Sequence, residues 1–532
     1  TLTTGQHVPD GQHWHGCPAE RTTVDYQRVP AAQVRWYRPV SYTIGQLAWL
    51  FLGPAPLLLG ALAWYAVSSH PAIVGALLGP EQFGLGDLRF YGVLFGGTLA
   101  LFVLGVPLGL LATFLLSRLT SLMLTPGRVY PLYGIHYTAQ RWITRLTNRR
   151  FYLTLFGDSS YIVGYLSRLG YRLRPVLQTG TNFGIVTMQD SPRLCAVGTG
   201  TMISDGASFA NAEYSSSSFR LGDVILGQRN YVGNIITLPT GARIGDNCLL
   251  ATKVLVPLEG PVRENVGLLG SPAFEIPRTV NRDTRIAHLE GGRKARSGLA
   301  AKNRYNRRTM ALFLLHRWFF ATLVTLVLAV AFDASSNGGW WILPLTLTLL
   351  PFGAAWYLVF VERLTMGFKP LQPQHCSIYD SYFWLHERYW KLGLTTALAS
   401  FDGTPFKSWF LRGLGARVGR RLLDDGSYFT DRSLASIGDD CTLNFHSLLQ
   451  SHSLEDGVFK SDRITVGDFC TVGTNAFIHY GTTLGARAIL GADSFLMKGE
   501  QIPPDGRWHG NPAGPDSREP AGADSTRQVT RR

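Results

Sequence analysis

Charged residues are scarce in this sequence. Lys, Arg, Asp and Glu make up 16% of its 532 residues, against about 25% in an ordinary soluble protein, while 46% of the residues are hydrophobic. This composition argues against a soluble protein of even make-up, and we expect the apolar excess to lie in long local runs. The formal net charge of +14 indicates either an anionic partner or basic loops beside a membrane.

Motifs for nucleotide, metal and disulfide chemistry are also missing. The sequence has no Gly-rich phosphate loop and no carrier-serine motif, and its basic residues form no pattern typical of nucleic-acid binding. The six cysteines form no CxxC pair, so we expect reduced cysteines in cytosolic cores. The first residue is not Met, no signal peptide follows, and the start is typical of the end of a domain, so we expect a fragment of a longer chain.

Four apolar runs are long enough to cross a bilayer, which takes about 20 residues. They occupy residues 44–67, 91–116, 310–332 and 340–361, and buried core helices are the alternative interpretation. Arg and Lys flank the outer ends of each pair, whereas the two connectors within the pairs hold only Arg89. Because basic flanks stay on the cytoplasmic side, both hairpins should point outward. The sequence therefore predicts a multi-pass protein of the bacterial plasma membrane with cytoplasmic soluble domains.

A period of six runs through the polar segments. In the last segment it joins Val466, Val472, Ile478, Leu484, Leu490, Leu496, Ile502 and Trp508. The same register occurs 240 residues earlier at Leu226, Val232, Leu238, Ile244, Leu250, Val256, Val262 and Leu268. Both copies also continue upstream in the same register, the earlier one at Val197, Ile203 and Phe209 and the later one at Ile437, Leu443 and Leu449. Each copy closes with Gly-x-Pro-Ala, and the same ending stands at Gly16-Cys17-Pro18-Ala19. The chain therefore holds the end of one copy and two complete copies.

A six-residue period predicts a triangular solenoid, in which an aliphatic residue points inward on each flat face and small residues allow the corners. This pattern resembles the left-handed parallel β-helix of the hexapeptide acyltransferase superfamily. The predicted fold class is thus membrane α-helical spans plus all-β left-handed parallel β-helix domains. We expect the last coil of a first domain at 1–20, a helix pair at 44–116, a second domain at 128–275, a helix pair at 310–361, a third domain at 376–513 and a disordered tail at 514–532. Aromatic helical segments at 130–146 and 379–394 should lead into the complete copies.

The hexad register breaks at equivalent places, between residues 209 and 226 and between 449 and 466. In the third domain this loop region carries His446 and His452, followed by Glu455 and Asp456. Histidine is suited to general-base catalysis because its pKa lies near neutrality, and a neighbouring carboxylate can hold its tautomer. We therefore predict His452, or else His446, as the base, with Glu455 or Asp456 as the carboxylate. The alternative is that both histidines are ordinary polar loop residues.

The second domain lacks these histidines. Gly206 stands where the third domain has His446, and Ala212 stands where it has His452. The pair of domains is therefore interpreted as one active copy and one degenerate copy. The two histidines lie six residues apart without an obvious third ligand, so no metal site is predicted.

The layout resembles the C-terminal membrane region of the ε-poly-L-lysine synthetase type of nonribosomal peptide synthetase. In that family adenylation and carrier domains precede six spans and three tandem soluble domains. The resemblance implies amide-bond formation between amino-acid monomers delivered as phosphopantetheine-bound thioesters, giving a homo-oligomer such as poly-lysine. It also implies that ATP and Mg²⁺ act only on an adenylation domain outside this sequence.

The same resemblance implies several partners: the upstream adenylation and carrier domains, the lipid bilayer, and an amino-acid or oligopeptide acceptor. The tandem domains would form an intrachain pseudo-trimer, and no nucleic acid is expected. Two alternatives stay open at this point. One is a membrane acyltransferase that uses acyl-CoA on a sugar or lipid, and the other is a non-catalytic docking or export scaffold.

Overall fold

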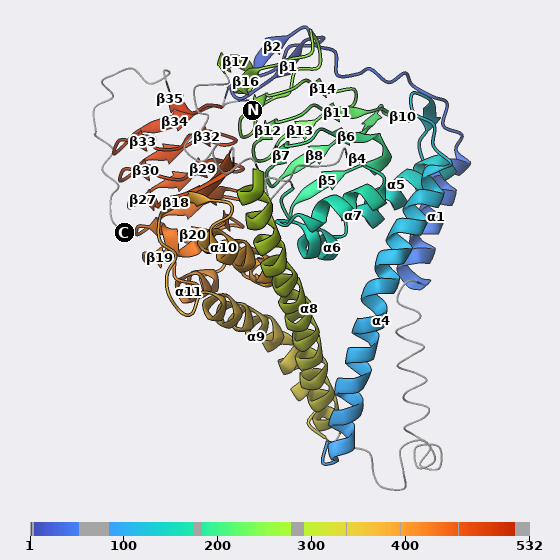
Figure 1. The fold of residues 1–532 in the computed structure, drawn as a ribbon, viewed down its shortest axis with the longest axis vertical. Helices are drawn as coiled ribbons and strands as arrows, with labels where there is room; N and C mark the ends of the chain where they lie inside the picture. The colour runs from blue at the N-terminus through green and yellow to red at the C-terminus, as the bar shows by residue number, and fades with distance from the viewer. Residues whose placement is uncertain are drawn as a thin grey trace.

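The computed structural model describes Leu2 and residues 5–52, 85–173, 183–277, 292–336, 338–393, 395–455 and 457–516. Two stacked-strand domains lie side by side, and long helices project together from them (Figure 1). The helices are α1 (Tyr37–Leu52), α4 (Leu88–Ser121), α5 (Ile135–Thr147), α6 (Arg150–Phe156), α7 (Tyr161–Leu169), α8 (Gly292–Ser336), α9 (Ile342–Thr365), α10 (Ser381–Leu392) and α11 (Phe406–Gly413).

The third domain is a three-sided solenoid whose strands pair in parallel along each side, apart from one antiparallel pair at the C-terminal end. Strands 18 residues apart, which is three hexads, lie next to each other, so Val466 pairs with Leu484 and Leu484 with Ile502. One side is β19 (Arg417–Val418), β22 (Ala435–Ile437), β27 (Ile464–Val466), β30 (Thr483–Leu484) and β33 (Gln501–Ile502). The second side is β20 (Leu423–Asp424), β23 (Thr442–Leu443), β28 (Thr471–Val472), β31 (Ile489–Leu490), β34 (Arg507–His509) and β35 (Gly514–Pro515). The third side is β21 (Tyr428–Phe429), β24 (Leu448–Gln450), β29 (Phe477–His479) and β32 (Phe495–Leu496).

The second domain repeats this arrangement. One side is β4 (Arg172–Leu173), β6 (Cys195–Val197), β11 (Val224–Leu226) and β14 (Arg243–Ile244). The second side is β7 (Met202–Ile203), β12 (Tyr231–Val232), β15 (Leu249–Leu250), β16 (Val266–Leu269) and β17 (Phe274–Pro277). The third side is β5 (Thr187–Gln189), β8 (Ala207–Phe209) and β13 (Thr237–Leu238). The predicted hexad residues fill the core of each solenoid, and Leu238, Leu250, Leu484 and Leu490 have no exposed surface. Burial of each such side chain stabilises the fold by about 1.5–3 kcal/mol. The predicted parallel β-helix is confirmed.

One predicted inward position is wrong. Val262 is 52% exposed, and Ile244 pairs instead with Arg263. The slip follows a segment containing Pro257 and Pro261, which lack the backbone N–H that a ladder needs. The register is therefore displaced by one residue at this position only, and it returns at Leu268, which is buried and pairs with Leu250.

The three Gly-x-Pro-Ala endings meet in a closed ring of backbone hydrogen bonds. The Cys17 N–H donates to the Ser271 carbonyl at 2.7 Å, the Ser271 N–H donates to Asn511 at 2.9 Å, and the Asn511 N–H donates to Cys17 at 2.8 Å. Lys253 of the second domain reaches the third, where its Nζ donates to the carbonyls of Asn475 at 2.8 Å and Asp493 at 2.9 Å. The two complete copies and the end of the first copy therefore contact one another within this one chain.

A β-hairpin interrupts each solenoid where the hexad register breaks. In the second domain it is β9 (Ala212–Tyr214) and β10 (Ser218–Leu221), extended by β3 (Val129–Pro131); in the third it is β25 (His452–Glu455) and β26 (Val458–Ser461), extended by β18 (Gln374–Ser377). The expected loop is thus an ordered hairpin. The expected aromatic lead-in helices are α5 and α10, which follow β3 and β18.

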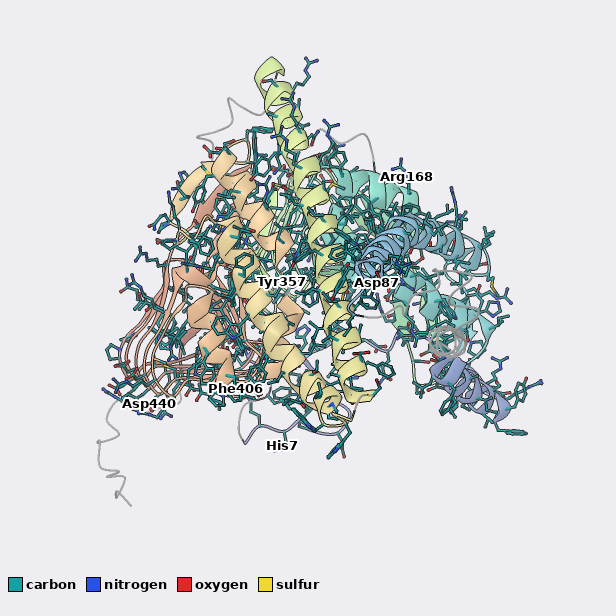
Figure 2. The ribbon with its side chains drawn as sticks, turned by 90° about the horizontal axis from the view of Figure 1, so that it is seen from below. His7, Asp87, Arg168, Tyr357, Phe406 and Asp440 are labelled. Carbon is teal, nitrogen blue, oxygen red and sulfur yellow. The ribbon has the colours of Figure 1, made fainter. Side chains whose placement is uncertain are left out.

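Three of the helices, α4, α8 and α9, are long and apolar enough to span a membrane. They pack together: Thr98 on α4 bonds to Thr322 on α8 at 2.9 Å, and His316 on α8 bonds to Tyr357 on α9 at 2.9 Å. Figure 2 looks at this bundle from below, with Tyr357 at the contact of α8 and α9. Of the predicted first span, residues 44–52 belong to α1 and residues 53–67 lie outside the described part. The predicted disordered tail 514–532 is wrong at its start, because Gly514–Pro515 form β35 and pair with β34; residues 517–532 lie outside the described part. The antiparallel pair β1 (His13–His15) and β2 (Glu20–Thr22) forms the end of the first copy.

Candidate active site

A fully buried carboxylate lies at the centre of the candidate site. Asp431 precedes a short 3₁₀ turn (Arg432–Leu434) in the third solenoid, and its side chain has no exposed surface. Its Oδ1 accepts hydrogen bonds from His386 Nε2 and Trp390 Nε1, both at 2.8 Å, and both donors lie on α10. Its Oδ2 accepts from His452 Nδ1 at 2.5 Å and from the Thr430 hydroxyl at 3.1 Å.

Electrostatics keep this carboxylate ionised. Burial alone would raise the pKa of Asp431, but the imidazoles of His452 and His386 outweigh burial and hold this pKa well below its ordinary value. Burial lowers the pKa of His386, so that ring is a neutral donor. Asp431 therefore fixes a proton on Nδ1 of His452, and Nε2 of His452 is left with the lone pair.

His452 points from β25 toward a cavity at the contact of the two solenoids. Trp390 stacks on its ring with centroids 4.3 Å apart, and the ring is 13% exposed. The Gln450 amide donates to its Nε2 at 3.0 Å. The cavity has a volume of about 50 Å³. Its remaining lining comes from the third domain (Ser453, Leu454) and the second (Asp158, Gly184, Met202, Ile203, Ser204, Asp205, Tyr231, Asn234).

The other predicted site residues lie elsewhere. His446 is exposed on a solenoid corner, where it stacks on Phe445 at 3.9 Å. Glu455 is ion-paired with Lys498 at 3.1 Å, so the carboxylate that holds His452 is Asp431, not Glu455 as predicted. The prediction failed because Glu455 is close in sequence but lies at the far end of β25, whereas Asp431 lies one coil below His452. Asp456 lies outside the described residues.

The second domain has the same framework without the acid and the bases. Matching the hairpin strands and lead-in helices places Gln140 at the position of His386, Ser191 at that of Asp431 and Ala212 at that of His452. The Gln140 amide there donates to the Asp190 carbonyl at 2.8 Å. Of these two domains, the third therefore carries the arrangement of His386, Asp431 and His452, and the second does not.

Sequence reasoning missed Asp431, His386 and Trp390. Asp431 lies 21 residues from His452 and outside the hexad period, and the aromatic segment with Trp390 was interpreted as core or membrane contact. The sequence did carry one signal for these three residues. Each of them stands where the second copy has an uncharged, non-aromatic residue. Among the residues that the structure describes, no group of three His, Cys, Asp or Glu side chains is placed to hold a metal ion.

The fold and this site define a hexapeptide-repeat protein with a buried carboxylate–histidine pair. The family model "Hexapeptide repeat of succinyl-transferase" matches residues 463–498. The chain is also similar to the δ-poly-L-ornithine synthetase of Acinetobacter baumannii (strain AB307-0294), with 25% identity over 433 residues. That match covers 78% of this chain and 31% of the synthetase, so the chain spans about a third of its relative's length. The resemblance to poly(amino acid) synthetases that the layout indicated is confirmed by this relative.

Solved hexapeptide-repeat structures are similar to single parts of the chain. An acetyltransferase from Vibrio cholerae O1 biovar eltor, solved with acetyl coenzyme A, is 18% identical, with 23% of this chain and 82% of that chain covered and a TM-score of 0.20. A maltose O-acetyltransferase from Clostridium difficile 630 is 16% identical, with 29% and 95% covered and a TM-score of 0.21.

Proposed function

We propose that this chain is the membrane-bound, amide-forming part of a nonribosomal peptide synthetase that makes a homopolymer of an amino acid. The monomers would arrive as thioesters on the phosphopantetheine arm of a carrier domain. The observation that carries the proposal is the Asp431–His452 pair, which turns an imidazole lone pair toward a cavity between two solenoids. The similarity to a poly-ornithine synthetase supports a peptide product rather than an acylated sugar or lipid.

The reaction needs one base at the acceptor amine. The amine displaces the Gln450 amide from Nε2 of His452, and the imidazole accepts a proton as the amine nitrogen attacks the thioester carbonyl carbon. The new C–N bond forms and the C–S bond breaks. The departing thiolate takes the proton from the imidazolium, so His452 returns to its neutral form. Asp431 stabilises the imidazolium in between because it is an ionised acceptor at Nδ1.

Membrane location is part of the proposal. The apolar helices α4, α8 and α9, with α1, would anchor the domains at the cytoplasmic face of the plasma membrane. Adenylation with ATP and Mg²⁺ and carrier loading would belong to domains upstream of this region. The solenoids would be left-handed, as in the resembling acyltransferases, and a complete first copy would close the pseudo-trimer.

The test uses the full-length protein in detergent with radiolabelled amino acid on its carrier. Thioester loading and amide product are measured in parallel for the wild type, His452→Ala and His446→Ala. His446→Ala is the matched control, since this histidine is an exposed neighbour of the same solenoid that does not line the cavity. We expect normal loading in all three and a loss of product of about 10²–10⁴-fold in His452→Ala alone. Equal product from His452→Ala and the wild type would refute the assignment.

A further inference from the structure

Two carboxylates of the second domain line the cavity opposite His452. Asp158 lies between α6 and α7, and Asp205 lies on the turn between β7 and β8. Both belong to the copy that has no catalytic histidine. The cavity therefore receives its base from one solenoid and its acids from the other.

The backbone at Asp158 is left-handed. Its φ is +46°, in the left-handed region that favours glycine. The third domain has Gly403 at this position, with φ +71°. The two positions are equivalent because their backbone N–H groups make matching hydrogen bonds: Asp158 donates to the Phe183 carbonyl, and Gly403 donates to the Asp424 carbonyl. Asp158 thus places a carboxylate in the wall of the cavity, where the third domain has no side chain.

Asp158 is 6% exposed, and within the described part of the chain its carboxylate makes no hydrogen bond or ion pair. The buried Lys391 lies close enough for its charge to oppose the effect of burial on the pKa of Asp158, but its Nζ makes its hydrogen bonds to the carbonyls of Leu155 at 3.0 Å and Gly157 at 2.5 Å. The buried Lys302 behind it is paired with Glu387. A buried acid that faces a cavity without a partner calls for a donor from outside the chain.

Asp205 completes the acidic wall. Its Oδ1 accepts the Val186 N–H at 2.8 Å, which fixes the side chain beside the cavity. The third domain has Phe445 at this position, since Asp205 and Phe445 accept equivalent backbone bonds from Ile235 and Asn475. Burial, and for Asp158 also the nearness of Asp205, raises the pKa values of both acids, and a cation between them would reverse that effect.

The third domain has two other acids beside Gly403, namely Asp402 and Asp424, and pairs them with a lysine. Lys407 on α11 donates to Asp402 at 2.6 Å and to Asp424 at 2.9 Å, so its acids are neutralised internally. The matching position on α7 of the second domain is Ile162, which is fully buried. Lys407 therefore has no counterpart on α7 of the second domain.

We propose that Asp158 and Asp205 bind the protonated amine of the acceptor and present it to His452. This inference rests on the proposed function and makes the second domain the acceptor-binding half of the active site, not a degenerate copy. The ammonium gives one proton to a carboxylate, which passes it to solvent, and gives the next to His452 as the C–N bond forms. The acceptor thus reaches the thioester as a neutral amine.

The test measures KM for the acceptor in the full-length, carrier-loaded protein. Asp158→Gly is chosen because Gly403 shows that glycine suits this backbone, and Asp205→Asn keeps an oxygen for the Val186 N–H. Asp223→Asn is the matched control, since Asp223 lies in the same domain in an exposed pair with Arg172. We expect a rise in KM of about tenfold or more in the first two variants, with normal loading and unchanged KM in the control.

A KM within twofold of the wild type in both variants would overturn this inference while leaving the proposed function intact. A wild type that loads its carrier and forms no amide would instead overturn the proposed function. Binding of n-butylammonium keeps the inference testable in that case. It should raise the melting midpoint of the wild type and of Asp223→Asn, and an equal rise in the Asp158→Gly/Asp205→Asn protein would contradict the assignment.

Discussion

Replacement of Asp431 by asparagine tests whether the buried carboxylate sets the tautomer of His452. The change keeps the shape of the side chain but turns one acceptor oxygen into a donor. Oδ1 holds two donors on α10, His386 and Trp390, so the amide nitrogen is best placed on the Oδ2 side, facing His452. An amide N–H there forces Nδ1 of His452 to accept, and the ring proton moves to Nε2. The nitrogen that faces the cavity then carries no lone pair for the acceptor amine.

The expected loss of rate follows from the loss of His452 as a general base. General-base catalysis contributes about 10²–10⁴-fold, and a wrong tautomer in a Ser-His-Asp site costs about 10⁴ in kcat. We expect Asp431→Asn to lower the rate of amide formation by about 10³–10⁴, equivalent to about 4–5.5 kcal/mol at the transition state. Folding should survive, because His386 and Trp390 keep their acceptor.

The assay is a single turnover of the preloaded full-length protein, followed as loss of thioester and gain of amide. Asp440→Asn is the control, since Asp440 lies on the same solenoid in an exposed ion pair with Arg421. An Asp431→Asn rate within threefold of the wild type, with an unchanged melting midpoint, would refute the tautomer argument.

Two further predictions concern the buried charges around α10. Glu362 of α9 holds Arg432, the neighbour of Asp431, at 2.6 Å and accepts from Tyr389 at 2.9 Å. Glu362→Gln leaves that arginine without its counter-charge and should destabilise the protein by about 3–5 kcal/mol, measured as a lower melting midpoint in detergent; a midpoint like that of Asp440→Asn would contradict this. Burial lowers the pKa of Lys391 from 10.5 to about 8. Between pH 8 and 10.5 the folded state thus binds fewer protons than the unfolded state, so wild-type stability should rise with pH relative to Lys391→Met, by about 3 kcal/mol in total. Melting curves across this range check it, and a constant difference would show that the amine is charged in the fold.

Much of the architecture was predictable because one physical requirement repeats along the chain. Each hexad must bury one side chain, so Val466, Val472 and their successors mark the solenoid directly in the sequence. The apolar helices are marked in the same way by composition and length. The register slip at Val262 escaped because it depends on the path of a proline-containing loop, which periodicity does not encode.

The site was only half predictable. His452 stood out because histidine is rare and its loop interrupts the period, but its partners come from other coils and other domains. Asp431 is brought to it by the stacking of coils, and His386 and Trp390 by the docking of α10. Asp158 and Asp205 lie on a separate solenoid, so only the contact between copies shows that they face His452. An isolated acid in sequence carries no sign of such a contact.

The most direct test of the account asks which side chain lies beside the reacting carbonyl. The carrier of the full-length protein is loaded with a chloroacetyl-amino analogue of pantetheine, whose alkyl chloride stands near the thioester position. A nucleophile there forms a C–N or C–S bond and releases chloride, and peptide mass spectrometry locates the adduct. The account predicts alkylation of His452 in the wild type and its loss in His452→Ala. Labelling confined to another domain, with His452 unmodified, would contradict the placement of the active site between the second and third solenoids.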